Sequence, residues 1–263
     1  MHPEKCKVFY FSGTGNSIYI ANRLKQELGA QIYGMASFKG TETITVNAEM
    51  VGLVFPVYFM DTPGFVKSFI KRLRIPSSIY VFSIIHCGNM AGATLRNLKS
   101  ALAENGIILN TGHTLFLPDN SIFFYTKPEM VKPMLEEGER RLSEMISSLK
   151  AKQEISVAGS AASTLIPRMT EWFFEQVLGE RRKKVNREVC TRCGLCAKLC
   201  PVNCISYNDG YPVWKKTCVK CFACIHWCPM RAISFGRLRV SDKTAYRHPE
   251  CCVKEIEMQR NTK

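Results

Sequence analysis

The sequence has no long apolar run and relatively few acidic residues, and each of these features bears on the class of protein. No window approaches the roughly 18 consecutive apolar residues of a membrane span, and the first residues lead straight into a short strand, so we expect neither a membrane helix nor a signal peptide. Acidic residues are few, with 22 Asp and Glu against 36 Lys and Arg. No aromatic-basic interleaving or recognition motif accompanies this bias, which disfavours nucleic-acid binding. We expect a cytoplasmic protein whose thiols are reduced.

Eight of the 13 cysteines form one pattern, C-x2-C-x2-C-x3-C-P, that is written twice. Four thiolates suit a cubane of four irons and four sulfides, and in this pattern the fourth Cys ligates the other cluster. Zinc sites pair two short Cys knuckles and disulfides imply a secreted chain, so neither explains three evenly spaced cysteines before a Cys-Pro. The expected ligands of cluster I are Cys190, Cys193, Cys196 and Cys228, and those of cluster II are Cys218, Cys221, Cys224 and Cys200.

The repeat continues past these ligands, and residues 185–240 resemble the two-cluster bacterial ferredoxins. The resemblance implies a small α+β domain built from two pseudo-twofold halves with two 4Fe-4S clusters. Cys204 aligns with Ala232, which cannot bind iron, so we expect Cys204 to be a core residue. Trp227, beside Cys228, either shields cluster I from water or simply packs.

Positive charge is concentrated around this part of the chain. Residues 1–150 hold 16 Lys and Arg against 12 Asp and Glu, whereas residues 151–263 hold 20 against ten. A redox partner protein with an acidic surface fits this distribution better than nucleic acid does. With 263 residues, 46% of them hydrophobic, the chain is long enough for two domains.

Apolar runs alternate with helical patterns over residues 5–118, which predicts an α/β fold with a parallel sheet covered on both faces. The expected strands are residues 7–11, 31–35, 51–56, 79–86 and 113–117. The expected helices are residues 17–28, 63–73, 93–105 and 128–151.

The loop after the first expected strand has the composition of a phosphate site. Its glycines let the backbone close on an anion, its hydroxyls and amide add donors, and the following helix presents free N–H groups. It has neither the Lys of a P-loop nor the third Gly of G-x-G-x-x-G, because Ile18 takes that place. A plain helix cap explains this composition less well than a terminal phosphate does. The loop consists of Ser12, Gly13, Thr14, Gly15, Asn16 and Ser17.

This loop is similar to the phosphate loop of flavodoxins, and residues 1–152 resemble those proteins as a domain. The resemblance implies a flavodoxin-like doubly wound sheet of five parallel strands with bound FMN, and either Tyr58 or Phe59 stacked on the ring. A structural role suits His86, and Cys87 fits a small buried core residue better than it fits a residue that modulates the flavin. The implied contacts beyond the loop are Pro56, Val57, Tyr58, Phe59, Cys87, Gly88, Asn89, Asp119 and Asn120.

Residues 153–184 and 241–263 flank the predicted ferredoxin-like domain. We expect a helical linker in the first, where Trp172, Phe173 and Val177 clamp the domains together or, less simply, contact a membrane surface. The second is expected to be a C-terminal tail, in which Cys251 and Cys252 have no ligand spacing.

A flavodoxin-like domain followed by a two-cluster ferredoxin resembles the flavodoxin-ferredoxin fusion proteins. The resemblance implies an electron-transfer protein that passes single electrons between two clusters and FMN, and to or from a redox partner. Two alternatives stay open: an FMN-dependent oxidoreductase that reduces a small substrate, with His86 or Asp119 as proton source, and a redox sensor with structural clusters.

Overall fold

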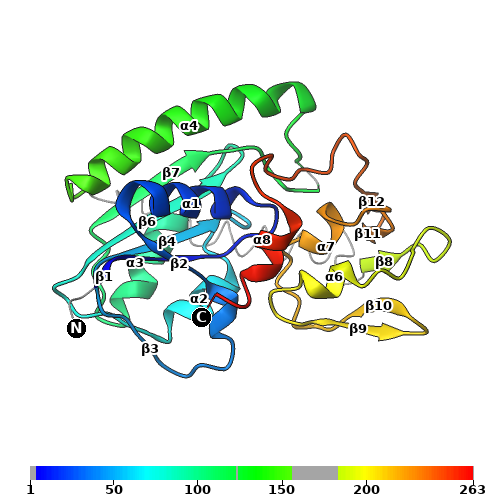
Figure 1. Cartoon of the computed structure of the whole chain (residues 1–263), viewed down its shortest axis with the longest axis horizontal. Helices are drawn as coiled ribbons and strands as arrows, with labels where there is room; N and C mark the ends of the chain where they lie inside the picture. The colour runs from blue at the N-terminus through cyan, green and yellow to red at the C-terminus, as the bar shows by residue number, and fades with distance from the viewer. Residues whose placement is uncertain (1–3, 123, 156–182, 263) are drawn as a thin grey trace.

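The computed structural model describes residues 4–122, 124–155 and 183–262 of the chain. A larger α/β part, blue to green in Figure 1, lies beside a smaller yellow and orange part, and the red C-terminal helix lies between them. Trp172, Phe173 and Val177, expected to clamp the domains, fall outside the described residues. Over the described ranges, no helix has both the length and the apolar character needed to cross a membrane.

Five parallel strands form the central sheet in the order β2-β1-β4-β6-β7. This is the doubly wound order of flavodoxin-like folds, so the predicted fold class is confirmed. Strands β4 and β6 lie in the middle of the sheet and are buried almost throughout, which explains why their sequences read as continuous apolar runs. The strands are β1 (Glu4–Tyr10), β2 (Gln31–Gly34), β4 (Ala48–Pro56), β6 (Tyr80–Cys87) and β7 (Thr111–Phe116).

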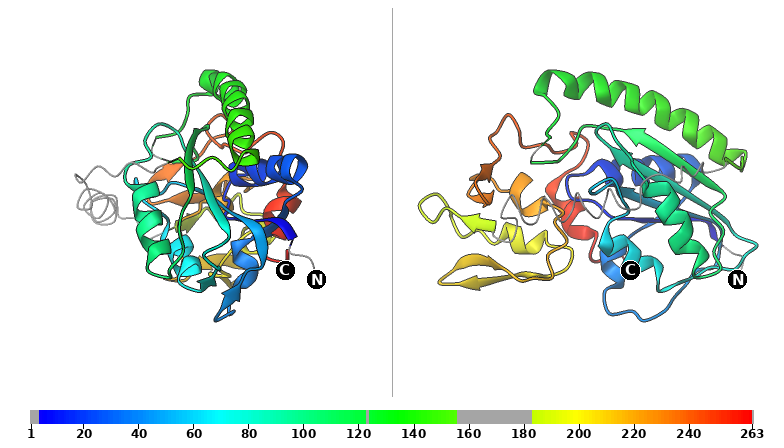
Figure 2. Two further views of the ribbon diagram at one scale, coloured as in Figure 1. Left: turned by 90° about the vertical axis from the view of Figure 1, so that its left-hand side faces the viewer. Right: turned by 180° about the vertical axis from the view of Figure 1, so that it is seen from behind.

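Helices cover both faces of this sheet, with α1 and α4 on one side and α2 and α3 on the other (Figure 2). The expected helix over residues 63–73 ends earlier, because Leu73 and Arg74 form strand β5 and pair with the short strand β3 (Ile44–Thr45). The helices are α1 (Asn16–Leu28), η1 (Met35–Phe38), α2 (Gly64–Ile70), α3 (Thr94–Ala103) and α4 (Pro128–Lys150).

The smaller part contains two antiparallel sheets and two one-turn helices, as expected of an α+β domain. The turn between β9 and β10 has positive φ at both Asp209 and Gly210, the conformation of a type I′ hairpin. Strand β8 begins at Lys183, inside the range expected to be linker. The elements are β8 (Lys183–Val185), α6 (Leu195–Lys198), β9 (Ile205–Asn208), β10 (Tyr211–Trp214), α7 (Ala223–His226), β11 (Ile233–Phe235) and β12 (Leu238–Arg239).

The sequence repeat is also a repeat of backbone conformation. Three residues of the first copy have positive φ, and the residue 28 positions later has positive φ in each case. The tight cysteine loops therefore follow the same path twice, even where the second copy has Phe222 in place of the more permissive Gly194. The pairs are Arg192 and Lys220, Gly194 and Phe222, and Asn203 and Arg231.

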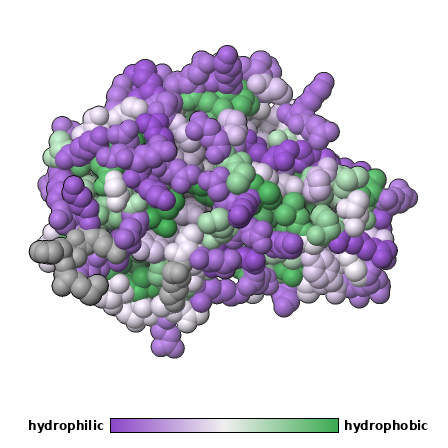
Figure 3. Space-filling view, in the orientation of Figure 1, coloured by the Kyte–Doolittle hydropathy of each residue, from purple (hydrophilic) through white to green (hydrophobic). Residues whose placement is uncertain are grey.

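The C-terminal tail, residues 241–262, is an integral part of the fold rather than a loose end. Its helix α8 (Val253–Met258) buries Ile256 in the main core of the α/β part. The tail passes so close to β2 that a Cβ at Gly34 would clash with the carbonyl oxygen of Gln259. Hydrophilic side chains cover most of the face in Figure 3, and hydrophobic ones show in smaller patches, one of them over α6 and α7.

Candidate functional site

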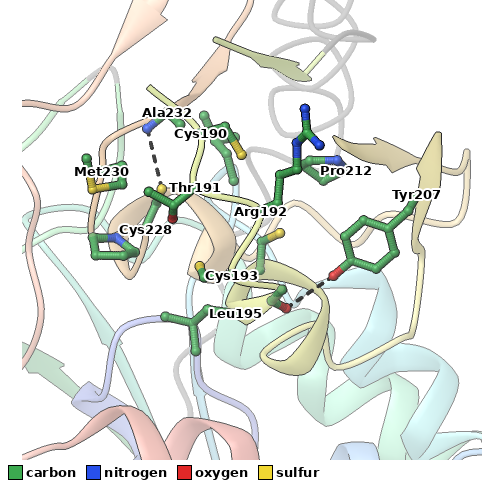
Figure 4. A pocket seen from close by; sticks show the side chains of 14 residues that line it. Cys190, Thr191, Arg192, Cys193, Leu195, Tyr207, Pro212, Cys228, Met230 and Ala232 are labelled. Carbon is green, nitrogen blue, oxygen red and sulfur yellow. Dashed lines mark hydrogen bonds between the residues drawn. The ribbon is translucent and has the colours of Figure 1, made fainter. Parts of the chain in front are cut away.

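Four of the predicted ligands line one pocket, here called pocket I: Cys190, Cys193, Cys196 and Cys228 (Figure 4). The first three come from the loop before α6 and from α6 itself, and the fourth crosses over from the second repeat. Cys193 is exposed and the other three are half-buried. The wall includes Arg192, Tyr207, Met230 and Ile233.

The other four predicted ligands line a second pocket, here called pocket II: Cys200, Cys218, Cys221 and Cys224. Cys218 is half-buried and the other three are buried. Within the described ranges, no three or more His, Cys, Asp and Glu side chains converge on one ion site; the eight thiols instead line these two pockets. The wall of pocket II includes Lys183, Cys204, Trp214 and Phe222.

The crossing cysteine of each pocket accepts a hydrogen bond at an equivalent place. The N–H of Cys204 donates to Cys200 Sγ at 3.2 Å, and the N–H of Ala232 donates to Cys228 Sγ at 3.4 Å. Such donors stabilise a negatively charged sulfur, and hydrogen bonds to the sulfurs are one of the factors that set cluster potentials. Both pockets therefore fit a thiolate-ligated cubane.

The Cys204 thiol itself distinguishes pocket II from pocket I. It is buried, as expected, but its Sγ lies 3.4 Å from Cys200 Sγ. Its hydrogen bond lowers the pKa of Cys200 to about 6. Hydrogen bonding from Cys204 and then the nearby ammonium of Lys183, which donates to Cys218 Sγ at 2.8 Å, lower the pKa of Cys218 to about 5 despite its burial.

The predicted phosphate loop lies at the carboxyl end of β1, and its side chains are buried. Asn16 Nδ2 donates to the Pro118 carbonyl at 3.0 Å, and Ser17 Oγ bonds His86 Nε2 at 2.8 Å. His86 is buried at the end of β6, and burial, followed by the proximity of His248, lowers its pKa to about 3. His86 is therefore neutral and positions Ser17.

The loop keeps backbone donors for an anion. No side chain caps α1, and within the described parts of the chain the N–H groups of Gly13, Thr14, Asn16 and Ser17 form no hydrogen bond. These groups are buried at the positive end of a 13-residue helix. Buried, unpaired donors at a helix N-terminus suit a phosphate group.

The predicted phosphate loop contacts the smaller part of the molecule directly. A Cβ at Gly13 would clash with the carbonyl oxygen of Cys221, so only glycine lets the two backbones approach this closely. Trp227 Nε1 donates to the Gly13 carbonyl at 3.0 Å. Trp227 thus joins the two domains, a role that neither sequence interpretation of this residue included.

Tyr58 and Phe59, the two predicted ring contacts, line one pocket of about 390 Å³ together with Cys218 and Lys220. Tyr58 Oη is buried and has no hydrogen-bond partner in the part of the chain that the structure describes, and the ring of Tyr58 lies edge-on to Phe11, just before the predicted phosphate loop. The Lys220 ammonium lies 5.3 Å from the centroid of the Phe59 ring. This pocket therefore opens between the α/β part and pocket II.

The remaining predicted contacts lie at the carboxyl ends of β4, β6 and β7, on the same edge of the sheet as the phosphate loop. Val57, after Pro56, donates its N–H to the His86 carbonyl at 2.9 Å, and Gly88 lies against Asp119. Cys87 is half-buried, with its pKa raised to about 12 by burial, and Asn89 is exposed. The carbonyl of Asn120 contacts His226 Nε2 at 2.8 Å.

Several residues at these sites could not be found by sequence reasoning. Gln259 bonds both the N–H and the carbonyl of Ser12, Tyr246 Oη donates to Asn16 Oδ1 at 2.6 Å, and His248 donates its N–H to the Thr14 carbonyl at 2.8 Å. Their separation of more than 200 positions from the loop leaves no motif or spacing to detect. Lys183 likewise carried no signal beyond its charge.

The comparisons with known proteins identify a family only within the smaller part of the molecule. Residues 183–206 match the 4Fe-4S binding domain family, and the strand order of the preceding part is flavodoxin-like. The chain joins a part with the flavodoxin-like fold to a segment that matches the 4Fe-4S binding domain family. No curated protein matches the sequence.

Solved structures resemble the flavodoxin-like domain only distantly. An apo NADH:FMN oxidoreductase is 12% identical to this chain, and the match covers 58% of this chain and 92% of the oxidoreductase with a TM-score of 0.40. The Trp repressor binding protein of Bacillus subtilis is 18% identical over 59% and 100%, with a TM-score of 0.38. Rubredoxin oxygen:oxidoreductase of Desulfovibrio gigas is 14% identical over 56% and 36%, with a TM-score of 0.37. The strand order, rather than these likenesses, establishes the fold.

Proposed function

We propose that this protein holds two 4Fe-4S clusters and one FMN, and that it passes single electrons between these centres and a redox partner protein. The observation that carries the proposal is the contact of Cys221, a predicted cluster II ligand, with Gly13 of the phosphate loop. A cluster and a flavin bound at these places would be neighbours within one folded unit. When bound, the clusters supply one-electron chemistry and the flavin one- or two-electron chemistry.

The protein residues have four tasks in this proposal. The cysteines of pocket I hold cluster I, and those of pocket II hold cluster II. The loop from Ser12 to Ser17 binds the FMN phosphate through its backbone N–H groups, and Tyr58 with Phe59 contacts the ring. The buried indole of Trp227 fixes the domains against each other through its bond to Gly13. A fixed contact keeps the distance between the centres constant and excludes water from between them.

Basic residues near pocket I support an acidic redox partner. Lys184, Arg187, Arg237 and Arg239 line a groove beside β8 and β12. Arg187 and Arg192 both lie over the ring of Tyr211, at 4.8 and 4.5 Å from its centroid, and Arg192 also lines pocket I. We propose that an acidic protein docks here and exchanges electrons through cluster I. None of the 13 cysteines is in a disulfide, which suits a reducing cytoplasm.

A second candidate, reduction of a small substrate at the flavin, is supported by Asp119. Burial raises the pKa of this carboxyl, so it is better suited to donate a proton than an exposed aspartate is. His86, the other proposed proton source, is occupied with Ser17 and remains neutral. Steady-state turnover of small acceptors by the wild-type protein and by Asp119→Asn separates the two functions. If only proteins accept electrons, the enzymatic candidate is wrong.

Anaerobic purification followed by measurement of iron, sulfide and acid-released flavin tests the main proposal. We expect about eight irons and eight sulfides with one FMN per chain, and reduction of both centre types on dithionite titration. Eight irons without flavin would contradict the flavin half of the proposal. Clusters that take up no electrons would contradict electron transfer and favour the redox sensor.

A further inference from the structure

We propose that His248, in the C-terminal tail, binds the phosphate of FMN at the N-terminus of α1. This inference rests on the proposed function, because it takes FMN as the occupant of the phosphate loop. It assigns a binding residue outside the flavodoxin-like segment of the sequence, and makes the tail part of the cofactor site.

His248 is held against the phosphate loop by its backbone and by its ring. Its N–H donates to the Thr14 carbonyl at 2.8 Å, and its ring stacks on Tyr19 of α1 at a centroid distance of 4.2 Å and an angle of 21°. Its Cβ would lie 3.0 Å from a Cβ at Gly15, which has a φ of 110°. The imidazole is therefore fixed beside the loop by contacts on three sides.

The hydrogen bonds of the His248 ring define which nitrogen carries the proton. The N–H of Glu250 donates to Nδ1 at 3.3 Å, so Nδ1 is the acceptor and Nε2 is the protonated nitrogen. Only 2% of His248 is exposed, and Nε2 is buried without a partner among the described residues. A buried N–H without an acceptor is costly, so this nitrogen points to a bound acceptor.

The groups around His248 are those of an anion site. The unpaired N–H groups of Thr14, Asn16 and Ser17 lie at the same helix end. His248 is also close enough to His86, which bonds Ser17, to contribute to the lowered pKa of His86. The loop donors and His248 Nε2 thus come from two adjoining segments of the chain, and each lacks an acceptor among the described residues.

His226 shows what a purely structural buried histidine looks like in this molecule. Its Nε2 contacts the Asn120 carbonyl at 2.8 Å, and its Nδ1 accepts from the Tyr246 N–H at 3.1 Å. Both nitrogens are satisfied by the protein. His248 is equally buried but has one satisfied nitrogen, and this contrast is the reason for assigning it to a ligand.

Binding of FMN and of riboflavin, which lacks the phosphate, tests the proposal in the full-length, iron-loaded protein. His248→Phe keeps a ring on Tyr19 but removes the donor, so we expect FMN affinity to fall about tenfold, the loss of one hydrogen bond to a charged group. Riboflavin affinity should not change. His248→Gln, which restores an N–H donor, should recover part of the FMN affinity, and His113→Phe, at β7, is the matched control with wild-type binding.

Each outcome separates this inference from the proposed function. If wild-type protein binds neither flavin, the proposed FMN site itself is wrong. If wild-type binds FMN and His248→Phe leaves its affinity unchanged, or weakens FMN and riboflavin equally, His248 is not a phosphate ligand. Iron content equal to wild type in every variant shows that the folded protein is being compared.

Discussion

The same cysteine pattern supplies the predicted ligands of pockets I and II, yet the two pockets differ in how deeply their cysteines are buried, in the charged residues nearby and in the segments they contact. Pocket I has the exposed Cys193 and lies beside basic surface residues. Pocket II has three buried cysteines, a lysine that donates to Cys218, and the phosphate loop against Cys221. Sequence repetition therefore produced two similar ligand sets in different surroundings, and the proposed function assigns them different tasks: pocket I would meet partners, and pocket II would face the flavin.

Removing the crossing cysteines gives the largest expected effect on this comparison. Cys200→Ser should abolish cluster II, because Cys200 lines the pocket of the second repeat, and Cys228→Ser should abolish cluster I. Iron content should fall by about half in each variant, and electron paramagnetic resonance of the reduced protein identifies the surviving cluster. Loss of the same cluster in both variants would contradict the crossed assignment.

Chelation of iron should reveal the difference in cysteine burial between pockets I and II. With an iron chelator under anaerobic conditions, we expect cluster I to be lost first, on the order of tenfold faster than cluster II, because Cys193 is exposed and three pocket II cysteines are buried. Visible absorption with resonance signals at timed intervals measures both rates. Simultaneous loss of the two clusters would show that the pockets open together.

Lys183 should raise the reduction potential of cluster II. Its ammonium donates to Cys218 Sγ and favours the more negative, reduced cluster, so Lys183→Gln should lower that potential on the order of 60 mV, one tenfold step for a one-electron couple. Lys184→Gln, next in the chain, is the control. A redox titration monitored by electron paramagnetic resonance should show cluster I unchanged, and an equal shift of both clusters would point to a general loss of charge.

Trp227→Phe should have the smallest of these effects. It changes the contact between the smaller part of the molecule and the flavodoxin-like domain. It leaves the Gly13 carbonyl without its indole donor, at a cost of about 1–3 kcal/mol in the free energy of unfolding. Anaerobic denaturant unfolding measures this cost. Unchanged stability would mean that the indole bond does not hold the domains together.

The features that depend on the spacing of nearby residues could be predicted from the sequence. The cysteine repeat predicted the two sets of cysteines that the structure brings together, hydrophobic runs predicted a parallel sheet, and the resemblance to flavodoxins implied that it is a doubly wound sheet of five strands. Residues 241–263 were predicted only as a C-terminal tail, whereas Gln259 and His248 form hydrogen bonds with Ser12 and Thr14 of the predicted phosphate loop. Such contacts join residues more than 200 positions apart, and no periodicity records them. Likewise, Lys183 looked like part of a basic linker until β8 placed it beside Cys218.

The most direct test of the central claim is the rate of flavin reduction after rapid mixing with a reduced acidic ferredoxin. The account predicts that the Cys200→Ser protein, without cluster II, reduces its flavin far more slowly than wild type, because pocket II is the one that contacts the phosphate loop. Flavin reduction at the wild-type rate in that variant would contradict the account.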